Sequence, residues 1–95
     1  MTEAATGPVA TEMRRRLETA LSPTALTLTD DSEQHRGHAG HDARGESHFS
    51  LSIESAAFAG QSRVARQRLV YAALGALMEE RVHALSIRAT APGEH

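Results

Sequence analysis

The sequence contains no cysteine, and this absence excludes several kinds of protein. A disulfide-stapled scaffold, a metal site built from the chain's own thiolates and a cysteine nucleophile all need that residue. No apolar run approaches the roughly 20 residues of a membrane-spanning helix. The N-terminal residues also lack the basic-then-apolar pattern of an export signal. We therefore expect a cytoplasmic protein that does not enter a membrane.

Lysine is absent too, and only three residues are aromatic, two Phe and one Tyr. The net charge is −2, whereas a nucleic-acid-binding domain usually carries a basic surplus and stacks bases on aromatic platforms. The chain has no phosphate-binding glycine motif and no serine nucleophile motif. Its 95 residues also leave little room for a deep cleft. We expect a single domain that is not an enzyme.

Hydrophobic periodicity predicts five elements in the order helix, strand, strand, helix, strand. Apolar residues at every fourth position indicate a first helix from Pro8 to Leu21, and Ser22-Pro23 stops it. Alternation predicts strands over residues 25–29, 48–55 and 83–89, with the first two forming a hairpin. A connector at 56–60 offers Phe58 for burial. A second helix is expected over 62–80, with Ser62 as its N-cap.

These elements predict an α/β (α+β) fold, in which a three-stranded sheet has helices on one face. The domain is expected to span residues 8–90. Residues 1–7 are small and polar and are expected to be a disordered N-terminus, and residues 91–95 are expected to be a disordered tail.

Histidine is the unusual feature, since the chain has six and three of them fall within a predicted loop at residues 33–46. His35, His38 and His41 are spaced by three with glycines between them, and imidazole is a common metal ligand. A solvated loop that simply carries histidines is the alternative, because this spacing is weakly specific. A metal site made by the loop alone is disfavoured, since ordering a loose loop costs entropy.

Two further histidines lie next to predicted strands. His83 shares strand parity with Leu85 and Ile87, so it points to the apolar side at the first position of its strand. It is either a ligand or a hydrogen-bonded residue at the edge of the core. His48 precedes Phe49 and is expected to face with the serines of its strand.

Three arginines, Arg63, Arg66 and Arg68, fall in the first turns of the second predicted helix. A helix N-terminus with basic side chains can meet phosphates, because its free amide groups and dipole also favour anions. A solvated arginine face is the alternative.

Five short segments, in this order and at this spacing, closely resemble the BolA family over residues 9–92. The segments are Asp30-Asp31-Ser32, Glu46-Ser47-His48-Phe49, Phe58-x-Gly60, Arg66-Gln67-Arg68-Leu69-Val70-Tyr71 and Val82-His83-Ala84-Leu85-Ser86-Ile87. The loop sequence around His35 and His38 resembles the histidine-loop type of the family. The resemblance implies a fold similar to a class II KH domain but without its GxxG loop, and no GxxG occurs here.

The resemblance also implies a partner and a cofactor. BolA-like proteins bind monothiol glutaredoxins with a CGFS site, and the pair holds a bridging 2Fe–2S cluster. The glutaredoxin and glutathione supply thiolates, and the BolA-like protein supplies the histidine of its third strand and a loop ligand. By motif these metal ligands are His83 and a loop histidine, His38 in preference to His35. The implied role is an adaptor in iron–sulfur cluster trafficking or in iron and redox regulation.

One position departs from the family pattern, because Gln67 stands where a histidine is common. Glutamine can hydrogen-bond but does not titrate, so we assign it no metal role. The alternative function implied by the family is a DNA-binding, stress-responsive transcription regulator, which would place Arg63, Arg66 and Arg68 near DNA. Without its partner and the cluster, the chain is expected to be a monomer or a weak dimer.

Overall fold

Three strands form one mixed sheet in the order β1-β2-β3 in the computed structural model, which describes residues 7–31, 48–82 and 84–94. Strand β1, Ala25–Asp30, pairs antiparallel with β2, His48–Glu54, and the predicted hairpin is confirmed. Strand β3, Ala84–Thr90, pairs parallel with β2. A parallel pair needs a crossover connection, which here contains the helices between β2 and β3.

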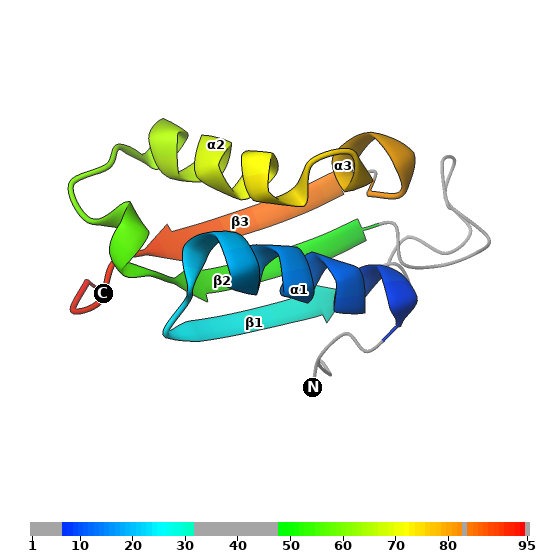
Figure 1. The fold of residues 1–95 in the computed structure, drawn as a ribbon, viewed down its shortest axis with the longest axis horizontal. Helices are drawn as coiled ribbons and strands as arrows, with labels where there is room; N and C mark the ends of the chain where they lie inside the picture. Colours follow the sequence, from blue (N-terminus) through cyan, green and yellow to red (C-terminus); the bar gives the residue numbers. More distant parts are fainter. Residues whose placement is uncertain (1–6, 32–47, 83, 95) are drawn as a thin grey trace.

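The sheet has one apolar face, and the helices cover it (Figure 1). Phe49, Leu51 and Ile53 of β2 are each at most 2% exposed, while Ser50 and Ser52 between them point to the other face. Helix α1, Pro8–Leu21, contributes a buried residue at nearly every fourth position: Val9, Met13, Leu17 and Leu21. The predicted architecture of helices on one face is therefore confirmed.

A short 3-10 helix, η2, spans Ala56–Phe58 and leads from β2 to the second helix. Phe58 is fully buried, as the sequence predicted. The side chain of Ser55, only 1% exposed, joins this turn to the end of α1. Its hydroxyl donates to the carbonyl oxygen of Leu21 at 2.6 Å and accepts from the backbone nitrogen of Ala57 at 3.1 Å.

The second helix is shorter than the sequence predicts. Ser62 is its N-cap as expected, since the hydroxyl accepts from the backbone nitrogen of Ala65 at 3.1 Å. Helix α2, Arg63–Leu74, then ends at Gly75, and a separate helix α3 spans Leu77–Glu80. Gly75 has φ 58° and ψ −135°, a conformation that glycine adopts easily and other residues avoid. The prediction of one continuous helix to residue 80 was wrong for this reason.

The C-terminal residues differ from the disordered tail expected after residue 90, as far as the structure describes them. Ala91 is only 4% exposed and belongs to the core. Glu94 forms an ion pair with Arg66 of α2, with 2.6 Å between Oε1 and Nη1. The described chain therefore packs onto the domain as far as Glu94, while residues 1–6 and 95 lie outside the described part and the expected domain bounds stay a prediction. None of the described helices is long and apolar enough to cross a membrane.

Candidate functional site

The predicted metal ligands His83, His38 and His35 lie outside the described residues, so their predicted roles stay predictions. The residues that flank them are described. Strand β1 ends at Asp30 and β2 begins at His48, so both ends of the segment 32–47 lie at one end of the sheet. His48 is in register with Ala84, the first residue of β3, so the start of β3 lies at this same end of the sheet (Figure 1).

This end of the sheet, which we call the histidine end, is held by hydrogen bonds of the flanking residues. The backbone nitrogen of Asp31 donates to the carbonyl oxygen of His48 at 2.7 Å, and the Ser50 hydroxyl donates to the Asp31 carboxylate. Val82, which directly precedes position 83, is 3% exposed, and its backbone nitrogen donates to the carbonyl oxygen of Leu77 at 3.0 Å. The chain therefore has fixed anchor points on both sides of the candidate ligands.

His48 is the one histidine within the described residues. It is half-buried and shares the strand parity of Ser50 and Ser52, so it faces away from the helices as predicted. Among residues 7–31, 48–82 and 84–94, no group of three or more His, Cys, Asp or Glu side chains could hold a metal ion. The described part of the chain therefore contains no complete metal site of its own.

The three arginines proposed to contact nucleic acid have different environments. Arg66 is anchored: its Nε donates to the Gln61 carbonyl oxygen at 3.0 Å, and its Nη1 donates to the Ala89 carbonyl oxygen at 3.1 Å. Both Nη1 and Nη2 also donate to the Glu94 carboxylate, at 2.6 and 2.9 Å. These bonds hold the pKa of Glu94 down at about 2 and raise the pKa of Arg66 above its usual value.

Arg63 and Arg68 are exposed, but they do not form one surface with Arg66. At 3.6 residues per turn, Arg63 and Arg66 lie about 60° apart around the helix axis, whereas Arg68 lies about 140° or more from both. Arg68 consequently points away from β3. The three arginines therefore do not form a single stripe on the helix that could face DNA.

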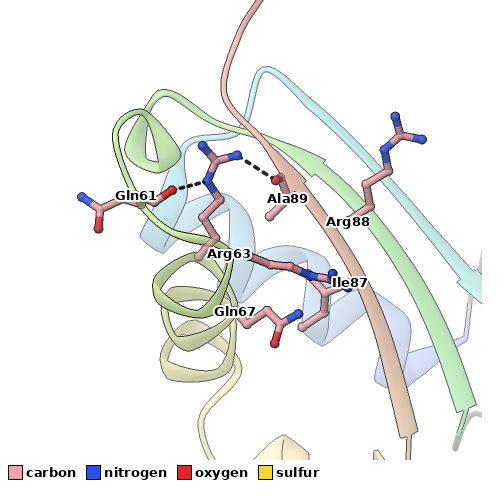
Figure 2. A pocket seen from close by; sticks show the side chains of 7 residues that line it. Gln61, Arg63, Gln67, Ile87, Arg88 and Ala89 are labelled. Atoms are coloured by element: carbon pink, nitrogen blue, oxygen red, sulfur yellow. Dashed lines mark hydrogen bonds between the residues drawn. The ribbon is translucent and has the colours of Figure 1, made fainter. Parts of the chain in front are cut away.

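A groove of about 450 Å³ separates the first half of α2 from β3 (Figure 2). Arg63, Arg66 and Gln67 line it from the helix, Gln61 lines it from the turn before the helix, and Ile87, Arg88 and Ala89 line it from the strand. This groove, which we call the arginine groove, lies near the end of β3, whereas the histidine end lies at its start. Ala84 and Ala89 are five positions apart in β3, which is about 16 Å along a strand.

Sequence reasoning did not find the arginine groove. The spacing of Arg63 and Arg66 was one available signal, because residues three apart lie near one another on a helix. The sequence around Ile87 and Ala89 gave no sign that these residues lie beside α2, because that depends on β3 being the edge strand of the sheet.

Comparison with known proteins agrees with this fold. The family model described as BolA-like protein matches residues 17–94. An uncharacterised protein of Sinorhizobium sp. is 42% identical over 83 residues, covering 86% of this chain and 89% of its own length. BolA-like protein 1 of Mus musculus is 42% identical over 91 residues, covering 96% of this chain. The chain spans 64% of that mouse relative.

A solved structure gives the same result. The BolA domain of SufE1 from Arabidopsis thaliana superposes with a TM-score of 0.84 and 45% sequence identity, covering 96% of this chain and all of that one. With a family model that matches most of its length and relatives above 40% identity, the chain belongs to the BolA family.

Proposed function

We propose that the protein is a non-enzymatic adaptor that shares a 2Fe–2S cluster with a monothiol glutaredoxin, in iron–sulfur cluster trafficking or in iron and redox regulation. His83 and one loop histidine, His38 in preference to His35, would bind iron. The glutaredoxin and glutathione would supply thiolates. The observation that carries the proposal is that the described neighbours of His83 and of the loop meet at the histidine end of the sheet.

The donor chemistry fits a shared site. Iron–sulfur clusters need thiolate or imidazole ligands, and this chain has imidazoles but no cysteine. Imidazole ligation also raises the potential of a cluster relative to ligation by thiolates alone. A chain with this composition can complete a cluster site but needs a thiolate-bearing partner to hold the cluster.

The described residues would position the ligands. The bond between Asp31 and His48 and the bond between Ser50 and Asp31 fix the two ends of the segment that carries His35 and His38. Buried Val82 and strand β3 fix the chain on both sides of position 83. Such anchoring lowers the entropy lost when ligands from separate segments converge on one metal.

An iron–sulfur role is also supported by the SufE1 relative, in which a BolA domain is part of a SufE protein. A cytoplasmic location and the histidine-loop subtype belong to this proposal. The likeness to class II KH domains stays a prediction.

A titration with a cluster-loaded CGFS glutaredoxin tests the proposal. Visible absorption and circular dichroism should change as this protein is added, because replacement of a cluster ligand alters the charge-transfer bands. His83→Ala should abolish the change. Of His38→Ala and His35→Ala, the one that weakens it identifies the loop ligand.

His48→Ala is the matched control, because His48 lies at the same end of the sheet but faces away from the helices. It should leave the spectral change intact. An unchanged spectrum with folded wild-type protein, or equal loss with His83→Ala and His48→Ala, would rule out the proposed ligand set.

DNA binding is the alternative, and the anchored Arg66 and the diverging Arg68 weigh against it. A DNA-binding surface on α2 would give salt-dependent binding to a duplex that Arg63→Gln and Arg68→Gln both weaken. The adaptor proposal predicts no such dependence on Arg68.

A further inference from the structure

We propose that the arginine groove docks an extended acidic peptide segment of a partner protein, which adds as a further strand along the edge of β3 that pairs with no described strand. This inference is independent of the proposed cluster role, because the groove lies near the opposite end of β3 from the histidine end. It rests on the strand edge, the charges beside it and a carboxylate that the chain already binds there.

Strand β3 is an edge strand, since the sheet order is β1-β2-β3. The Ala89 carbonyl oxygen accepts from Arg66 Nη1 at 3.1 Å, so it points away from β2 and toward the groove. Backbone groups alternate direction along a strand, and Ile87 therefore directs its N–H and C=O to the same outer side. The outward N–H and C=O of Ile87 form no hydrogen bond with another described residue and can pair with another extended chain, whereas the Ala89 carbonyl oxygen is already bonded to Arg66.

Glu94 shows that carboxylates bind at this edge. Its two oxygens accept from both terminal nitrogens of Arg66, and Oε1 also accepts from the Ala91 backbone nitrogen at 2.9 Å. A guanidinium fork together with a backbone N–H is a strong carboxylate-binding arrangement. The chain's own acid occupies this position at the end of the groove.

Arg63 offers a second guanidinium without a bound carboxylate. Figure 2 shows its side chain reaching from α2 toward β3 beside Ile87. Arg63 forms no ion pair with any described residue, and the half-buried Gln67 amide lines the groove next to it. The groove therefore presents a cation that pairs with no described carboxylate, and an amide, alongside a strand edge to which no described strand is paired.

A peptide fits these features better than a nucleic acid. Strand addition uses main-chain hydrogen bonds for affinity and alternate side chains for specificity, and only a peptide has the matching backbone. Half-buried Ile87 offers an apolar contact between the cationic ones. In the fitting segment every second residue is acidic, because alternate side chains share one face of a strand and these would lie on the face that carries Arg63. A DNA duplex would instead need a broad basic surface, and Arg68 does not contribute to one because it points away from the groove.

The test uses the full-length protein and a fluorescent hexapeptide, Glu-Val-Glu-Val-Glu-Val, with both termini blocked. Fluorescence anisotropy gives the affinity, and amide chemical shifts should change at residues 84–90 and 61–67. Arg63→Gln should weaken binding about three- to fivefold, as expected for one solvent-exposed ion pair. Arg68→Gln, on the same helix but outside the groove, is the matched control and should have no effect.

Two further peptides separate strand addition from simple charge attraction. A peptide with Lys in place of Glu should not bind. A peptide with the same charge but N-methylated at alternate backbone nitrogens should bind at least tenfold more weakly. Equal affinity of the methylated peptide would overturn strand addition. Equal weakening by Arg63→Gln and Arg68→Gln, or displacement of the peptide by a tighter-binding DNA duplex, would overturn the peptide site.

Discussion

Replacing Ser55 with alanine removes a buried hydroxyl that links α1 to η2. The change leaves the Leu21 carbonyl oxygen without its 2.6 Å donor and the Ala57 backbone nitrogen without its 3.1 Å acceptor. One buried polar group left unsatisfied costs about 1–3 kcal/mol, and loss of a capping side chain costs about 0.5–2 kcal/mol. The two costs add to about 1.5–5 kcal/mol, and within that span we expect a loss of about 2–3 kcal/mol of folding free energy.

For a domain of this size, each kcal/mol lowers the melting temperature by about 4–8 °C, so Ser55→Ala should lower it by roughly 8–24 °C. Thermal and urea unfolding followed by far-UV circular dichroism measure both quantities. Ser52→Ala is the matched control, because Ser52 is exposed on the open face of the sheet and should change stability by less than about 0.5 kcal/mol. A Ser55→Ala variant as stable as Ser52→Ala would refute the assigned hydrogen bonds.

Three further predictions concern the fold. Gly75→Ala should cost about 1–3 kcal/mol in urea unfolding, because a Cβ is strained at φ 58°, and an unchanged midpoint would contradict that conformation. Phe58→Ala should cost about 3–5 kcal/mol by the same assay, since the ring is fully buried, and a loss below about 1 kcal/mol would argue against its burial. The pKa of Glu94 is about 2 in the folded protein against an ordinary 4.5, so its bond to Arg66 stabilises the fold above about pH 4.5. That stability is lost as the pH falls toward 2, and Glu94→Gln should flatten the measured pH dependence in this range; an unaltered profile would speak against the ion pair.

Most of the architecture could be predicted from the sequence because hydrophobic spacing reports which face of an element is buried. The four-residue spacing from Val9 to Leu21 and the two-residue spacing from Phe49 to Ile53 correspond to α1 and β2. The N-cap Ser62 and the buried Phe58 were also predictable, since each depends on its local sequence context.

The structure differs from the sequence prediction where a tertiary contact or a backbone conformation, and not the local hydrophobic pattern, determines the result. Apolar spacing continues through Gly75 to buried Leu77, so periodicity could not locate the end of α2. The contact that joins Glu94 to the domain is made with Arg66, which lies 28 residues earlier in the chain. No local pattern contains that pairing.

The candidate sites likewise depend on tertiary arrangement that local sequence does not reveal. The histidine ligands were proposed from a family resemblance, and the structure places their described neighbours at one end of the sheet. The arginine groove needs the knowledge that β3 is an edge strand beside α2. Arg63 and Arg66 alone indicated a basic helix start but not the surface that they face.

The central claim is that this chain supplies imidazole ligands to a shared cluster. Pulsed electron paramagnetic resonance on the reduced heterocomplex with glutaredoxin tests it most directly, with nitrogen-15 histidine incorporated only in this protein. The account predicts nitrogen-15 couplings from two directly bound imidazoles, of which His83→Ala removes one. A cluster signal without nitrogen-15 couplings from this chain would contradict the account.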